Sequence, residues 1–201
     1  MNRTAAVGLG VVAVVLILAL IVVGYGVSVY NRLISADESV KSSWGQVENQ
    51  YQRRYDLIPN LVETVKGFAK QEREVLEGVT NARARVGQLT VTPEVLNNPE
   101  AFARFQEAQD GLSSALSRLL AVVENYPQLR SNENFLTLQA QLEGTENRIA
   151  VERRRFNEAV QNYNVMIRRF PSSVVAGMMG FREAVYFKSA AGAEEAPQVR
   201  F

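Results

Sequence analysis

The side chains in this chain that could do chemistry are the few polar residues that interrupt apolar stripes with helical spacing. Residues three or four positions apart share one face of a helix, so these side chains would meet inside a helical bundle. If the helices turn near residues 59 and 131 at the same end of such a bundle, Glu72 and Thr145 lie at the same level along it and share one layer. The predicted polar layer consists of Arg54, Glu72, Arg83, Thr145, Asn147 and Glu152.

This polar layer has a structural and a functional interpretation. In the structural one, satisfied buried contacts fix the register of helices that are otherwise nearly equivalent. In the functional one, the layer is a ligand pocket or a pair of catalytic carboxylates. A hydrolase that works with carboxylates alone would use Glu72, Glu143 or Glu152. The structural interpretation is the simpler one, and we predict no catalytic residue.

The composition narrows the chemistry further, because the chain contains neither His nor Cys. It therefore lacks thiolate nucleophiles, the usual general base and the commonest transition-metal ligand. Di-metal helical bundles usually need a Glu-x-x-His pairing, which this chain cannot form. The formal net charge of +1 provides no long-range field for nucleic acid. We predict a non-enzymatic protein with no metal, no cofactor and no nucleic-acid partner.

Residues 1–29 predict a membrane anchor with a short N-terminal flank. The segment from Ala5 to Tyr25 carries no charge and consists mostly of Val, Leu, Ile, Ala and Gly. A helix of about 20 apolar residues spans the hydrocarbon core of a bilayer, whereas the apolar core of a signal peptide has about 7–15 residues. We therefore predict a single transmembrane helix in contact with membrane lipid. The short basic flank with Arg3 favours a cytoplasmic N-terminus.

Residues 30–171 have helical spacing throughout and no convincing strand alternation. Their apolar stripes cover residues 33–58, 61–86, 101–122 and 135–170. This pattern predicts an all-α protein in which the anchor is followed by an antiparallel up-down four-helix bundle with long helices. Pro59 should end or kink the first helix. Asn98 should cap the third helix, and Ser131 or Asn132 the fourth.

Residues 172–188 form a short apolar segment that we expect near the membrane, because the fourth helix returns toward the anchor. One interpretation is a segment packed on the base of the bundle, and the other is an interfacial or partner-binding segment. The candidate residues for interaction are Val174, Val175, Met178, Met179 and Phe181. Residues 189–201 are mostly small and polar, and they predict a disordered tail.

Several ordered motifs resemble the LemA family. In the first half they are Tyr30-Asn31, residues 54–62 (RYDLIPNLV) and Ala82-Arg83-Ala84. In the second half they are residues 133–136 (ENFL), 142–149 (LEGTENRI) and 159–164 (AVQNYN). Phe170-Pro171, Gly180-Phe181 and Phe187 resemble the ending of the family. The similarity covers about Tyr30 to Phe187, which is nearly all of the chain after the anchor.

The resemblance implies a single-pass protein of the bacterial cell (inner) membrane with an antiparallel four-helix bundle. It implies no reaction, because the family has no established biochemical activity. Gln71 precedes Glu72 where many relatives carry His-Glu, which argues against a role for a titrating imidazole or a metal. Tyr30-Asn31 and Tyr163-Asn164 would meet at the membrane end, where we expect them to organise the base of the bundle.

We therefore predict a membrane-anchored helical scaffold or adaptor of the bacterial envelope. It would act through a protein partner or by forming a homo-oligomer. The alternative is a module that senses a small ligand bound between its helices.

Overall fold

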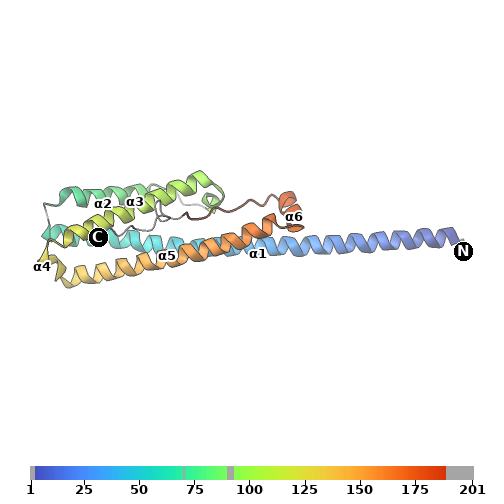
Figure 1. Ribbon diagram of the computed structural model, residues 1–201, viewed down its shortest axis with the longest axis horizontal. Coiled ribbons are helices and arrows are strands. Elements are labelled where there is room, and N and C mark those ends of the chain that lie inside the picture. The colour runs from blue at the N-terminus through green and yellow to red at the C-terminus, as the bar shows by residue number, and fades with distance from the viewer. Residues whose placement is uncertain (1–2, 70, 90–92, 189–201) are drawn as a thin grey trace, which may run out of the picture.

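The protein is built from helices that run along one long axis (Figure 1). The computed structural model describes residues 3–69, 71–89 and 93–188, and no strand occurs within those ranges. The helices are α1 (Arg3–Phe68), α2 (Arg73–Gly87), the 3-10 helix η1 (Pro93–Asn97), α3 (Pro99–Val123), α4 (Pro127–Arg130), α5 (Glu133–Arg168) and α6 (Ser172–Met179). The predicted all-α class, with one long apolar N-terminal helix, is confirmed.

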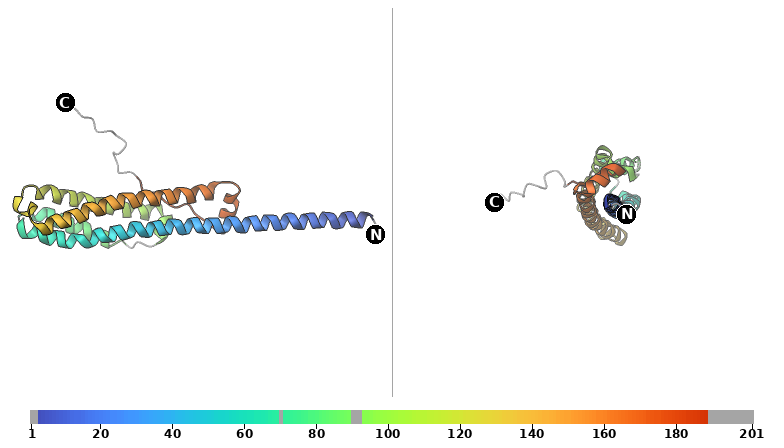
Figure 2. Two further views of the ribbon diagram at one scale, coloured as in Figure 1. Left: turned by 90° about the horizontal axis from the view of Figure 1, so that it is seen from below. Right: turned by 90° about the vertical axis from the view of Figure 1, so that its right-hand side faces the viewer.

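Helix α1 continues without a break from the apolar N-terminal segment into the packed part of the protein. Figure 2 shows that its N-terminal part extends beyond the other helices. The large apolar side chains between Leu9 and Val27 are exposed in this part. It is the one helix in the described ranges that is long and apolar enough to cross a membrane.

Pro59 lies inside α1, so the prediction that it ends the first helix is wrong. A proline in a helix leaves the carbonyl four residues earlier without its usual N–H donor. Here that carbonyl belongs to Tyr55, and the Arg83 Nε donates to it at 3.2 Å. The Arg83 guanidinium also lies 3.8 Å from the centre of the Tyr55 ring. A side chain from α2 therefore replaces the missing backbone bond and allows α1 to continue to Phe68.

The first turn at the distal end, which is the end farthest from the N-terminus of α1, thus lies between Phe68 and Arg73 rather than near Pro59. Because of this shift, the second predicted apolar stripe, residues 61–86, lies partly at the end of α1 and partly on α2. Phe68 is 44% exposed as a result, although the spacing placed it on a buried face.

The predicted helix caps at Asn98 and Asn132 are confirmed. The Asn98 side chain accepts hydrogen bonds from the backbone N–H groups of Glu100 and Ala101, both at 3.1 Å. The Asn132 side chain accepts one from the N–H of Phe135 at 3.0 Å. These bonds satisfy donors that have no partner in the first turn of a helix.

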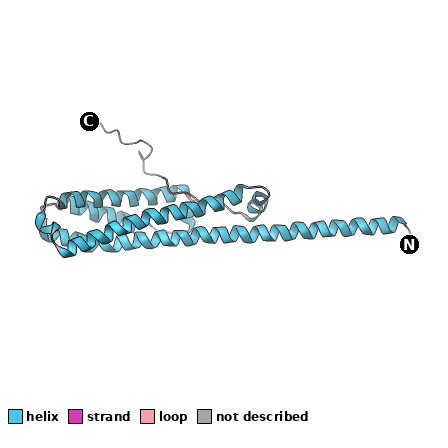
Figure 3. Ribbon diagram, turned by 60° about the horizontal axis from the view of Figure 1, so that its bottom comes forward, coloured by secondary structure: helices cyan, strands magenta, loops and turns pink. Residues whose placement is uncertain are grey.

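The long helices form two pairs, with α1 along α5 and α2 along α3 (Figure 3). Side chains between the pairs form two apolar clusters. The distal cluster includes Ile58, Leu119, Phe135 and Leu142. The other cluster is aromatic and is centred on Trp44, whose ring lies 5.4 Å from those of Phe105 and Phe156. We call it the aromatic cluster.

Replacing Leu142 by alanine should lower the free energy of unfolding by about 2–5 kcal/mol, because its side chain fills the distal cluster and would leave a cavity. Leu142 is 3% exposed. The measurement is urea unfolding of the full chain in detergent, followed by far-UV circular dichroism. Leu136→Ala is the matched control, since Leu136 lies on the same helix and is 49% exposed. Equal effects of the two changes would contradict this assignment of the buried face.

After α6 the chain turns back along the bundle instead of staying beside the exposed apolar part of α1. Gly180 adopts a φ of 76°, which favours glycine, and ends α6. Residues 182–188, which we call the strap, then run in an extended conformation beside α5 toward the middle of the bundle. The expectation that all of residues 172–188 lie near the membrane is therefore wrong for the strap. The predicted disordered tail at 189–201 lies outside the described residues.

Candidate functional site

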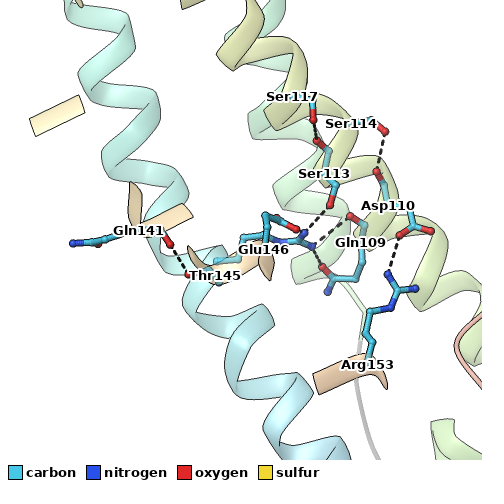
Figure 4. A network of polar contacts seen from close by, with 10 residues as sticks. Gln109, Asp110, Ser113, Ser114, Ser117, Gln141, Thr145, Glu146 and Arg153 are labelled. Carbon is cyan, nitrogen blue, oxygen red and sulfur yellow. Dashed lines mark hydrogen bonds and ion pairs between the residues drawn. The ribbon is translucent and has the colours of Figure 1, made fainter. Parts of the chain in front are cut away.

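The side chain of Arg54 joins the two helix pairs through hydrogen bonds to Gln109, Ser113 and Glu146, the three partners that Figure 4 labels. Arg54 is 1% exposed. Its Nη1 donates to the Ser113 Oγ at 2.7 Å and to the Glu146 Oε1 at 2.8 Å. Its Nη2 donates to the side-chain carbonyl of Gln109, which is itself 3% exposed. One guanidinium from α1 thus binds partners on α3 and α5.

This network is arranged as a clamp rather than as a reactive site. The charge of Arg54 is compensated by Glu146, and both of its terminal nitrogens donate to fixed acceptors, whereas its Nε is buried without a partner. Nearby, the Arg153 Nη1 lies 3.6 Å from the Asp110 Oδ1, which adds a second ion pair between α5 and α3. The Arg153–Asp110 pair and the hydrogen bonds from Arg54 to α3 hold α3 against the α1–α5 pair, whereas the Arg54–Glu146 ion pair joins α1 to α5.

The predicted layer of Glu72 with Thr145 does not exist. Glu72 lies at the distal turn, where it accepts a hydrogen bond from the Tyr126 Oη at 2.7 Å. That bond raises the pKa of Tyr126 above its ordinary value, because it stabilises the protonated phenol. Thr145 is buried on α5 and donates to the carbonyl of Gln141 at 2.7 Å. The layer was misplaced because Pro59 does not end α1.

The remaining residues of the predicted layer are also dispersed. Arg83 supports α1 at Pro59, as described above. Asn147 is exposed, so its assignment to a buried layer is wrong. Glu152 is partly exposed and accepts a hydrogen bond from Arg155 at 2.8 Å on its own helix. Of the six residues, Arg54 alone is fully buried at a junction where it binds side chains from two other helices.

The sequence reasoning missed the partners of Arg54. Gln109 and Ser113 lie four positions apart on α3, and Glu146 lies next to Thr145 on α5. Spacing predicts that Gln109 is buried, since it continues the buried stripe of Phe102, Phe105 and Leu112, but it does not identify Arg54 as its partner. The signal for Glu146 is weaker, because its side chain is 38% exposed.

A second polar arrangement holds the strap through amide side chains. Asn164 exchanges two hydrogen bonds with the backbone of Ala184, at 2.8 and 2.9 Å. Asn157 does the same with the backbone of Phe187, at 3.1 and 2.9 Å. Gln106 on α3 makes the equivalent pair with Lys188, at 3.0 and 3.2 Å. Each amide supplies one hydrogen-bond donor and one acceptor to the backbone of the strap, as a neighbouring β-strand would.

The strap delivers Phe187 into the aromatic cluster. Its ring lies 4.8 Å from that of Phe102 and 5.4 Å from that of Phe156. The guanidinium of Arg153 covers the outer face of Phe187 at 4.4 Å from the ring centre. The Asn164 side chain therefore binds the strap, rather than meeting Tyr30-Asn31 at the base of the bundle as the sequence predicts.

Replacing Asn164 by leucine should release the strap, because the buried N–H and C=O of Ala184 would lose their partners. A buried group left without a hydrogen bond costs about 1–3 kcal/mol. We expect faster hydrogen exchange at residues 183–188 and a red-shifted emission from Trp44, the single tryptophan. Asn162→Leu is the control, since Asn162 is exposed in the same motif. Unchanged exchange in Asn164→Leu would contradict the role assigned to Asn164.

A small cavity lies beside Tyr51, between α1 and the end of α2. Its volume is about 360 Å³, and Glu48, Tyr55 and Phe105 contribute to its lining. The Tyr51 Oη is buried and has no hydrogen-bond partner in the described structure. Burial raises the pKa of Tyr51 to about 12 and also raises the pKa of Glu48.

The outer face of the α2–α3 pair carries a larger groove, with a volume of about 940 Å³. We call it the α2–α3 groove. Small residues form its floor, and charged residues of both signs form its rim. The floor includes Gly78, Ala82, Ala108, Gly111 and Ala115, and the rim includes Glu74, Glu77, Arg85, Arg104, Glu107 and Arg118. No group of three or more potential metal ligands gathers here or elsewhere in the described ranges.

Comparison with known proteins finds similar magnetosome proteins in two bacteria. The chain is 27% identical over 175 residues to the magnetosome proteins MamQ 1 and MamQ 2 of Paramagnetospirillum magneticum. It is 28% identical over 174 residues to the magnetosome protein MamQ of Magnetospirillum gryphiswaldense. These alignments cover 79% of this chain and 64% of each relative, so the chain spans just under two thirds of their length. The model of the LemA family matches residues 43–201, which is most of the chain, and the protein belongs to the LemA family.

Proposed function

We propose that this protein is a non-enzymatic, membrane-anchored scaffold or adaptor of the bacterial envelope that acts by binding another protein chain. The observation that carries the proposal is the continuity of α1. The exposed apolar part of α1 and its buried part belong to one continuous helix. A membrane that holds the apolar part would therefore also hold the bundle. Residues 1–29 would be the anchor, and residues 30–171 the bundle.

Apart from Tyr51, whose hydroxyl faces the cavity without a partner, the polar side chains of the interior support a binding role rather than catalysis. The buried arginine, the buried amides and Thr145 bind protein atoms of the same chain. Catalytic groups usually face a pocket with a shifted pKa and a free reacting atom. Glu72, Glu143 and Glu152 are at least partly exposed and accept hydrogen bonds from neighbouring side chains.

We assign the binding of a partner to the α2–α3 groove. A groove with a floor of small residues lets the backbone of another helix approach closely, while charges on its rim select the partner and its register. A helix of another protein is the occupant we propose. Self-association through the same groove would appear in the experiment below as a complex that contains this chain alone.

The experiment fills the groove without disturbing the fold. A Cβ added at Gly78 or Gly111 meets no atom within 4 Å, so Gly78→Leu/Gly111→Leu places two bulky side chains in open space. We expect the complex captured by crosslinking in membranes to disappear. Gly144→Leu on α5 is the matched control, because its Cβ also meets nothing within 4 Å. Equal complex formation in both variants would refute the assignment.

We also propose an inner-membrane location with the N-terminus in the cytoplasm, on the basis of the basic flank at Arg3. The chain has no cysteine, so a single cysteine at the exposed residue Ser117 can be labelled selectively. A membrane-impermeant maleimide should label Ser117→Cys in intact spheroplasts. Labelling that requires lysis would reverse the proposed orientation.

The cavity beside Tyr51 favours a second candidate function, the sensing of a small ligand. Such a ligand would accept a hydrogen bond from the Tyr51 Oη and fill the apolar space against Phe105. A thermal-shift screen of small polar metabolites is the test. A hit that stabilises the parent chain but not Tyr51→Phe would support this candidate. A screen without such a hit would remove it.

A further inference from the structure

Helix α6 packs against α1 at the point where the exposed apolar surface of α1 ends. Its buried residue Ala176 is 1% exposed and lies in one cluster with Val29 and Leu33 of α1. After the turn at Gly180, Phe181 returns to α1, where its ring centre is 6.0 Å from that of Tyr30. The position of α6 relative to α1 is therefore defined by contacts on both sides of its C-terminal turn.

The other large side chains at the surface of α6 are apolar and exposed. Val174 is 53% exposed, Met178 79% and Met179 59%. Phe170, just before α6, is 79% exposed. Large exposed apolar side chains that lie together mark a surface that is covered in the working protein.

The level of α6 along α1 matches the boundary of a bilayer. A helix rises 1.5 Å per residue, so the stretch from Leu9 to Val29 is about 30 Å long, the thickness of the hydrocarbon core. Two tyrosines, Tyr25 and Tyr30, lie at this end of the stretch, and tyrosine is enriched where lipid meets water. Arg32 is the first charged residue of α1 after the apolar stretch.

The charges around α6 also suit a lipid surface. Arg168 and Arg169 precede the helix, and Arg182 follows it; all three are exposed. Glu183 is the acidic residue among them, with its Oε1 at 3.6 Å from the Arg168 Nε. Arginine side chains at this level can reach lipid phosphates while apolar neighbours enter the acyl region.

We propose that α6 lies in the membrane interface, with Val174, Met178 and Met179 among the upper acyl chains and Arg169 and Arg182 against phospholipid phosphates. This inference rests on the proposed anchoring of α1 in a bilayer. The exposed apolar face of α6 continues the exposed apolar surface of α1, and both are covered by the same lipid. A second contact with the membrane prevents rotation of the bundle about α1, so the α2–α3 groove faces a fixed direction relative to the surface.

The experiment is fluorescence quenching of the full chain reconstituted in vesicles of phosphatidylethanolamine and phosphatidylglycerol. Single cysteines at Met178, Leu16 and Ser117 carry a small fluorophore, and the absence of native cysteine makes each label unique. Lipids brominated near the headgroup end of their acyl chains quench from within the bilayer, and iodide quenches from water. Leu16 is the bilayer reference and Ser117 the water reference. A second label at Val174 repeats the test, and unchanged Trp44 emission shows that each variant is folded.

We expect brominated lipid to quench the labels of Met178→Cys and Leu16→Cys but not that of Ser117→Cys. Iodide should quench the label of Ser117→Cys and neither of the other two. If iodide alone quenches the Met178 and Val174 labels while lipid quenches Leu16, the inference about α6 is wrong and the anchor remains. If lipid quenches neither Leu16 nor Met178, the proposed membrane anchor itself fails. If the Met178 and Val174 labels are protected from both quenchers, protein covers α6, and the inference is overturned as well. Energy transfer between labelled copies would then show that the covering protein is a second copy of this chain.

Discussion

Replacing Glu146 by alanine should lower the free energy of unfolding by about 3 kcal/mol, because it leaves the charge of Arg54 buried without its counter-ion. Arg54 is 1% exposed, and its carboxylate partner lies at 2.8 Å. Ser113 and Gln109 would still accept hydrogen bonds from the guanidinium, but neither carries a negative charge. Urea unfolding of the full chain in detergent, followed by Trp44 emission and circular dichroism, measures the change.

A double-mutant cycle separates this electrostatic effect from lost packing. Arg54→Met keeps an unbranched side chain and removes the charge. When Glu146→Ala is added to the Arg54→Met variant, it should cost less than about 1 kcal/mol, because no buried charge remains to be compensated and Glu146 is partly exposed. Equal costs of Glu146→Ala in the parent chain and in the Arg54→Met variant would show that Glu146 does not compensate Arg54.

Replacing Phe156 by alanine should cost about 3–5 kcal/mol, because its ring is central to the aromatic cluster and no neighbour can fill the space that it leaves. Phe156 is fully buried, and it contacts the rings of Trp44, Phe102 and Phe187. These rings come from α1, α3 and the strap, so the cavity would weaken three contacts of α5 at once. The same unfolding measurement applies.

The control for Phe156 is Phe170→Ala. Phe170 is 79% exposed, and exposed substitutions usually change stability by less than about 0.5 kcal/mol. A near-neutral result for Phe156→Ala would place α5 in a different register from the one described. A large loss from Phe170→Ala in detergent would instead mean that Phe170 packs against protein.

The helices and their buried faces were predictable because apolar spacing is local information. Val40, Trp44, Val47 and Ile58 all lie on one predicted stripe, and all are buried. The caps at Asn98 and Asn132 were predictable for the same reason, since a cap and the N–H groups that it binds lie within three residues.

The polar contacts were not predictable from spacing, because they depend on residues far apart in the chain. Pro59 remains helical because Arg83 binds the carbonyl of Tyr55, which lies 28 positions earlier in the sequence but next to Arg83 in space. That one contact moves the distal turn and separates Glu72 from Thr145. The strap was not predictable for a similar reason. The amide side chains of α3 and α5 bind its backbone N–H and C=O groups, which are present whatever the side chains of the strap are. An amide that binds a distant backbone leaves no pattern in the sequence around it.

We propose that the bundle binds another protein through the α2–α3 groove while α1 holds it at a membrane. The most direct test is photocrosslinking in living cells from a probe at Ser114, which contributes to the lining of the groove, and from a matched probe at Arg148 on the opposite pair. We expect one discrete protein adduct from the probe at Ser114, which is absent with the probe at Arg148 and lost in Gly78→Leu/Gly111→Leu. If the probe at Ser114 captures no protein in membranes where the chain is abundant and folded, the α2–α3 groove does not bind a protein partner.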